Sequence, residues 1–154
     1  MKIPLICATA ALALILAKPA ACAVTCSIGS VAGVAFGIYD VFRGTALDSA
    51  GAVTFRCDNV SAQDTVLIQL SRGSSASFQP RTLQHGMDQL QYNLYLDPSR
   101  STIWGDGSSG TSQYGPISPP DASSVLLNIY GRVPSHQNVR AGSYSDTLVV
   151  TIVF

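Results

Sequence analysis

Charge is scarce in this chain of 154 residues. Only 12% of the residues are charged, and nine basic residues balance nine acidic ones, with no basic patch and no acidic run. Nucleic acid and anionic membrane surfaces are therefore poor candidate partners. Hydrophobic residues make up 47% of the chain. So apolar a composition favours a protein that buries surface against copies of itself or against partners.

Residues that usually mark a catalytic or metal site are also few. His85 and His136 are isolated, without a partner at metal-ligand spacing, which argues against a zinc site. Serines are numerous, but the Gly-x-Ser-x-Gly motif of one large class of hydrolases is absent. We therefore expect no enzyme activity, no metal and no cofactor.

The N-terminus has the pattern of a secretory signal. Lys2 precedes a run over residues 3–17 that is apolar with two exceptions, and small residues follow at 20–23. An apolar run of this length that ends in Ala-x-Ala predicts a signal peptide over residues 1–23. An uncleaved anchor would need about 20 apolar residues. We expect an exported protein without a membrane span in residues 24–154.

Two of the four cysteines, Cys26 and Cys57, would remain after this cleavage. An even pair in an exported protein predicts one disulfide bond. It would close a loop of about thirty residues and stabilise the domain by roughly 3–4 kcal/mol in the chain-entropy model. A lipoprotein would be acylated at Cys22, but Pro19 stands where such a signal has a Leu-like residue.

Residues 24–154 are enough for one domain. Apolar residues alternate in the manner of strands, and no stretch predicts an amphipathic helix. Segments rich in Gly, Pro, Asp and Ser separate the expected strands, which favours an all-β, antiparallel, immunoglobulin-like sandwich. The six expected strands contain residues 34–38, 53–57, 66–70, 90–96, 125–129 and 147–154.

The last expected strand is unusually apolar. Residues 148–154 carry no charge, and both faces of the strand are apolar. Such a strand aggregates when it is left at an open sheet edge. An immunoglobulin-like sandwich has about seven strands, and only six are evident here. Either another strand of this chain covers the last expected strand or a strand from outside does, and an incomplete sandwich that lacks its last strand would explain both observations.

Short motifs along the chain together resemble the spore coat protein U domain family, which includes pilins of archaic chaperone-usher pili. The resemblance implies an immunoglobulin-like fold whose last strand is supplied by a periplasmic chaperone and then, at an outer-membrane usher, by another pilus subunit. The protein would pass through the periplasm to the cell surface. The motifs are Cys26, FGIYD at 36–40, a strand ending at Cys57, Arg81, LQYNLYLD at 90–97, IWGDG at 103–107, YGRVP at 130–134, Gln137 and GSYSDTLVVTIVF at 142–154.

Strand addition of this kind takes its affinity from main-chain hydrogen bonds and its specificity from pockets for alternate side chains. We expect the acceptor groove beside the last strand and the first one. Its predicted residues are Val34, Phe36, Ile38, Leu148, Val150, Ile152 and Phe154.

The predicted cleavage leaves only Val24 and Thr25 before Cys26. So short a segment cannot lie along a groove in a neighbour, so the chain should accept a donor strand but not give one. This favours a fibre tip or terminator, or a coat protein outside any pilus.

Apolar residues in loops rich in Gly, Pro and Ser are candidates for a contact with glycan or abiotic surfaces. The alternative for Trp104 is a tight turn in which it packs locally, and without a second carboxylate near Asp106 this is the better interpretation. The candidate loop residues are Ile103, Trp104, Tyr114 and Ile117.

The competing function is a secreted, self-complete lectin-like module.

The processing prediction is directly testable. The intact mass of the exported protein should show the loss of residues 1–23 and of two hydrogens, since Cys26 and Cys57 are bonded. A mature chain that begins at Cys22 and carries a diacylglyceryl group would contradict it.

Overall fold

The computed structural model describes residues 23–154, and its regular elements are all strands. The predicted signal peptide lies outside the described residues, apart from Ala23. In the described part, no helix is long and apolar enough to cross a membrane. The eight strands are β1 (Thr25–Ala32), β2 (Leu47–Asp58), β3 (Val66–Leu70), β4 (Arg81–His85), β5 (Asp88–Tyr95), β6 (Tyr114–Ile117), β7 (Ser123–Val133) and β8 (Val150–Val153).

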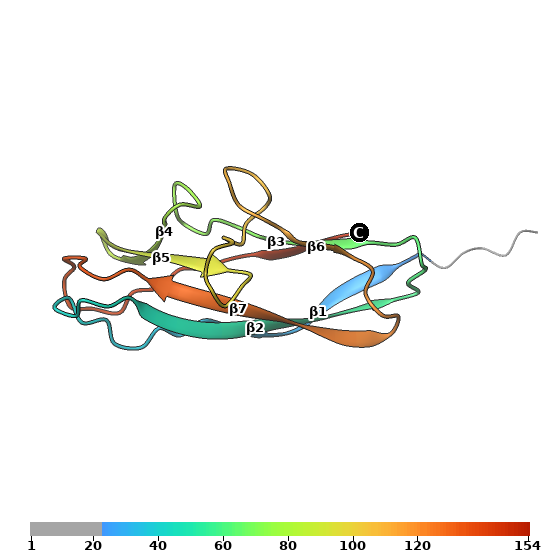
Figure 1. The fold of residues 1–154 in the computed structure, drawn as a ribbon, viewed down its shortest axis with the longest axis horizontal. Coiled ribbons are helices and arrows are strands. Elements are labelled where there is room, and N and C mark those ends of the chain that lie inside the picture. Colours follow the sequence, from blue (N-terminus) through green and yellow to red (C-terminus); the bar gives the residue numbers. More distant parts are fainter. Residues whose placement is uncertain (1–22) are drawn as a thin grey trace, which may run out of the picture.

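The strands form two sheets, one with the order β1-β2-β7-β5-β4 and one with the order β6-β3-β8. Neighbouring strands are antiparallel in both. The sheets pack as two layers of an elongated sandwich, with β2 and β7 in one layer and β3 and β6 in the other (Figure 1). The all-β, antiparallel, immunoglobulin-like prediction is confirmed.

The longest pairing joins β2 to β7, from Leu47 opposite Val133 to Cys57 opposite Ser123. Alternate residues of β2 point into the sandwich, as expected for a strand with one face on the core. Both sheets contribute to this core. Its buried apolar residues are Val53, Phe55, Cys57, Val66, Ile68, Leu70, Phe78, Leu90, Tyr92, Leu94, Trp104, Leu127, Ile129 and Val133.

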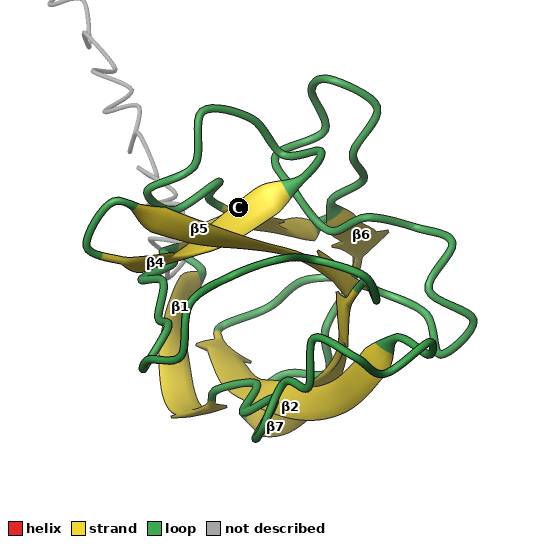
Figure 2. Cartoon of the chain, turned by 90° about the vertical axis from the view of Figure 1, so that its left-hand side faces the viewer, coloured by secondary structure: helices red, strands yellow, loops and turns green. Residues whose placement is uncertain are grey.

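The five-stranded sheet curls at β5. That strand pairs with β7 through residues 93–95 and with β4 through residues 88–92. Figure 2 shows the result, with β4 and β5 lying across from β2 and β7. A bridge between Gln84 and Ser145 then connects β4 to the segment that leads into β8.

The predicted disulfide is present between Cys26 and Cys57. The two cysteines are register partners in the antiparallel pair of β1 and β2. Since β1 is an edge strand, the disulfide is a covalent link across its pairing with β2.

The expected strand over residues 34–38 is wrong, because residues 33–40 belong to no strand. Val34 and Phe36 do pack against the core, so the alternation reports side-chain burial rather than strand pairing. Gly37 has a φ of 76°, a left-handed conformation that interrupts an extended strand.

The sequence pattern does not predict three of the strands, β1, β4 and β6. β1 is mostly exposed and mixes apolar residues with small polar ones, and pairing with β2 orders it. β4 buries Arg81 where an apolar residue is expected. β6 contains Gly115 and Pro116, which usually indicate a turn.

The buried arginine of β4 joins separate segments inside the sandwich. Arg81 is 0% exposed, and its guanidinium donates to Asn93 Oδ1 at 2.7 Å, Trp104 O at 2.6 Å and Ser71 O at 3.0 Å. The guanidinium carbon also lies 5.0 Å from the centre of the Phe78 ring. None of the ion pairs within residues 23–154 includes Arg81, so neutral oxygens satisfy the charge.

We predict that Arg81→Met lowers the free energy of unfolding by about 3 kcal/mol or more, because buried oxygens lose their donors. Arg72→Met is the matched control, since Arg72 is exposed and donates to Ala76 O. This control should change stability by no more than about 0.5 kcal/mol. Urea unfolding of both variants measures the difference, and equal losses would contradict the prediction.

Candidate functional site

A groove opens between the edges of the two sheets. β1 ends one sheet and β8 ends the other, and no pairing joins them within residues 23–154. A cavity of about 230 Å³ lies there. Its floor is core from both sheets, including Val53, Leu70 and Ile129. An incoming side chain would therefore contact the interior of the sandwich.

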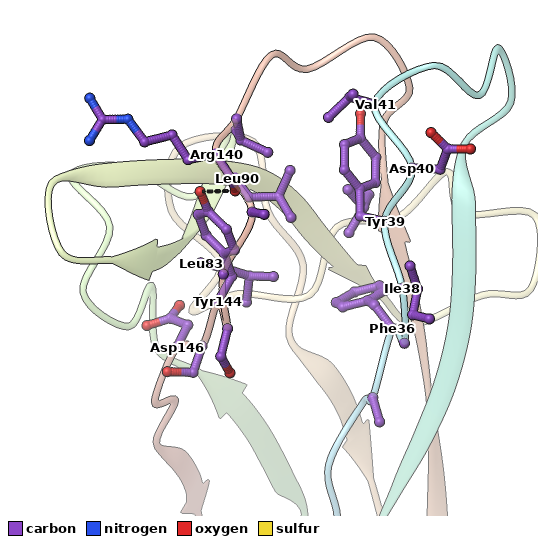
Figure 3. Close-up of a pocket in the computed structure, with 18 of the residues that line it drawn as sticks. Phe36, Ile38, Tyr39, Asp40, Val41, Leu83, Leu90, Arg140, Tyr144 and Asp146 are labelled. Carbon is purple, nitrogen blue, oxygen red and sulfur yellow. Dashed lines mark hydrogen bonds between the residues drawn. The ribbon is translucent and has the colours of Figure 1, made fainter.

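A larger cavity of about 1000 Å³ adjoins the first and is bounded by residues 34–42 and 139–146. Figure 3 shows Phe36 and Tyr39 on one side, with Tyr144 and Asp146 facing them on the other. Both cavities share Val34, Phe36, Leu83 and Asp146. We call the two together the acceptor groove.

Residues 34–42 form the first wall of the groove, and side-chain hydrogen bonds hold this wall in place. Ser49 Oγ donates to Ala35 O at 2.6 Å, and Tyr39 Oη donates to Pro134 O at 3.0 Å. Gly131 of β7 lies beneath this wall, and a Cβ there would come within 2.6 Å of Val34. Glycine at this position therefore lets the wall lie close to the sheet.

Residues 139–146 form the second wall, which leads into β8. β8 pairs with β3 along one edge, for example Val150 with Leu70. Ser71 extends this attachment, since its backbone N–H donates to Val149 O at 2.9 Å and its Oγ accepts from Val149 N–H at 2.9 Å. The other edge of β8 faces the groove. Its backbone groups are available to a further strand.

Tyr92 connects the two walls across the floor. Its ring packs edge to face on Phe36, with centroids 5.9 Å apart. Its hydroxyl donates to Asp146 Oδ2 at 2.6 Å. Burial, followed by the hydrogen bond to the negatively charged Asp146, raises the pKa of the Tyr92 hydroxyl far above its usual range. Tyr92 therefore stays protonated and acts as a donor.

The structure brings together most of the predicted groove residues. Val34, Phe36, Leu148 and Val150 all line the smaller cavity. Ile38 lines the larger one, although 92% of its surface is exposed.

The last two predicted residues, Ile152 and Phe154, line neither cavity. Ile152 packs against the core, whereas Phe154 is 58% exposed. The sequence interpretation missed Leu83, Tyr92 and Asp146. Tyr92 had a signal in its alternation with Leu90 and Leu94, and Asp146 had one as the acidic residue just before the apolar last strand.

The structure removes Trp104 from the candidate surface loop and agrees with the interpretation that its side chain packs. Its side chain is 0% exposed, and its indole N–H donates to Ile68 O at 3.0 Å, so it belongs to the core. Tyr114 and Ile117 lie in β6 and are half-buried, as is Ile103. A surface contact through these three residues stays a prediction.

The comparisons with known proteins agree with this fold. Residues 9–151 match the model of the Spore Coat Protein U domain family. The chain is 34% identical over 145 residues to Protein U of Myxococcus xanthus, an alignment that covers 84% of this chain and 77% of that protein.

Among solved structures, the fold is similar to a chain in the CsuC-CsuE chaperone-tip adhesion subunit pre-assembly complex from archaic chaperone-usher Csu pili of Acinetobacter baumannii. The TM-score is 0.52 and the identity 16%, with 86% of this chain covered. The match spans 40% of that chain. At this identity the likeness concerns the fold.

The all-β fold and the family match together define a β-sandwich protein of the spore coat class and not an enzyme. The chain belongs to the Spore Coat Protein U domain family.

Proposed function

We propose that this chain is a subunit of a surface pilus or coat and that its acceptor groove receives a β-strand from a partner protein. The observation that carries the proposal is an apolar groove, open to the core, between two sheet edges that are unpaired in the described part of the chain. An added strand would satisfy the backbone groups of these edges and fill the cavities with alternate side chains.

The burial of apolar side chains would favour the binding of a donor strand in the groove. Each large apolar side chain that a donor strand buries contributes roughly 1.5–3 kcal/mol before ordering costs. About four such side chains would approach the whole net stability of a domain, which is about 5–15 kcal/mol. The chain should therefore depend on a partner for part of its stability.

The resemblance to pilins of chaperone-usher pili suggests the partners that would fill this groove. A periplasmic chaperone would supply the strand first, and another subunit would replace it at an outer-membrane usher. The structural neighbour supports the first step, because it comes from a pre-assembly complex of a chaperone and a subunit. The protein would thus be exported to the periplasm and then to the cell surface.

The start of the domain supports a terminal position in a fibre. β1 begins at Thr25, and Val24 already packs against the core. If the predicted cleavage after Ala23 occurs, Val24 alone would precede β1, which is too short a segment to serve a neighbour as donor strand. The purified chain should therefore not polymerise with itself, and electron microscopy that showed homopolymeric fibres would refute a tip or terminator role.

The main test is expression in the periplasm with and without the candidate chaperone. Without it, soluble yield and the urea midpoint should fall, because the groove stays empty and its edges are exposed. Val150→Lys should weaken binding of an apolar donor peptide about tenfold or more, since it places a charge in the groove. Ser109→Lys, in an exposed loop, is the control and should leave binding unchanged.

A contrary result would change the functional assignment. A chain that is equally soluble and stable without a chaperone, and that has no affinity for a donor peptide, would be complete in itself. The self-complete lectin-like module would then be the better description.

A further inference from the structure

Asp146 stands out in the acceptor groove because it is the one charged residue among those that line the smaller cavity. It also lines the larger cavity and therefore lies where the two adjoin. The other residues around it are mostly apolar, including Phe36, Leu83 and Leu148. A donor strand with apolar side chains at every inward position would place one of them near this carboxylate.

The hydrogen bonds of Asp146 are unevenly divided between its two oxygens. Oδ1 accepts from Ser74 N–H at 3.0 Å, Ser74 Oγ at 2.8 Å and Thr147 N–H at 2.9 Å. Oδ2 accepts from Tyr92 Oη at 2.6 Å. Since a carboxylate has about four acceptor sites shared between its oxygens, Oδ1 is fully used and Oδ2 can accept another donor.

The carboxylate is also fixed in position. Gly73 has a φ of 65°, and a side chain at that position would collide with the carboxylate of Asp146. The backbone of residues 73–74 therefore lies directly against the carboxylate. With Tyr92 on the other side, Asp146 cannot readily turn away from an incoming strand.

The negative charge of Asp146 interacts at longer range with the positive charge of the buried Arg81. No ion pair within the described residues includes Asp146. Arg81 is buried and bonded to neutral oxygens. Burial lowers the pKa of the Arg81 guanidinium, and the negative charge of Asp146 opposes that effect. A neutral hydroxyl would give Oδ2 a further donor without burying a second charge in the groove.

We propose that Asp146 makes the acceptor groove selective for a donor strand with a Ser or Thr at the inward position that meets Asp146 Oδ2, and apolar residues at its other inward positions. The inference rests on the proposed function. A hydroxyl there would give Oδ2 a second donor, whereas an apolar side chain would cover the open side of this oxygen and leave Tyr92 Oη as its one donor.

The test compares synthetic donor peptides on the exported chain. The reference peptide has Val at every inward position, and each of the others has one Val replaced by Thr, which has nearly the same shape. At one position the Thr peptide should bind about tenfold more tightly than the reference, and at the others more weakly. Titration calorimetry or a fluorescent label gives the ratio of Kd values.

Two variants of the chain assign this preference to Asp146. In Asp146→Ala the advantage of the Thr peptide should disappear. In Tyr92→Phe it should widen, because Oδ2 loses its present donor. Each ratio compares two peptides on one variant, so a change in the variant's own stability cancels. If Asp146→Ala fails to fold, Tyr92→Phe alone decides.

The remaining outcomes separate the two proposals. If the reference peptide binds and Thr weakens binding at every position, the selectivity of Asp146 is refuted and strand addition stands. A Lys peptide that binds more tightly than the Thr peptide also refutes the neutral donor. If no peptide binds, the groove is not a strand acceptor and both proposals fail.

Discussion

The pairing of β2 with β7 is the interaction on which the rest of the domain depends. It runs from Leu47 opposite Val133 to Cys57 opposite Ser123 and supplies a continuous face for the core. β1 attaches to the outer edge of β2, and β5 attaches to the outer edge of β7. Both ends of the larger sheet, and with them the first wall of the groove, are positioned by this pair.

The acceptor groove follows from how the second sheet is attached. β8 hydrogen-bonds to β3 along one edge, and the curl at β5 brings β4 against the segment before β8. The apolar interior is therefore open between β1 and β8, where no strand of the described chain joins the two edges. An opening at this place is a property of the topology rather than of a few side chains.

The sequence predicts the strands in which apolar residues alternate, and it predicts the disulfide because only one pairing of cysteines is possible after cleavage. The strands around Phe55, Ile68 and Leu127 were found because their apolar residues alternate, and the disulfide because two cysteines remained. The sequence does not predict β4, because Arg81 is charged and the acceptors of its hydrogen bonds come from distant segments. The candidate surface contact at Trp104 fails for a similar reason, because the acceptor of its indole N–H is a carbonyl of the distant strand β3.

The disulfide also has a mechanical consequence. Tension on a strand held between β1 and β8 would act along both of them and load their hydrogen bonds in shear. On the β8 side, four residue pairs with β3 would resist the load. On the β1 side, the load would reach a covalent bond at Cys26 and Cys57, so the first strand could not peel away from the sheet beyond that point.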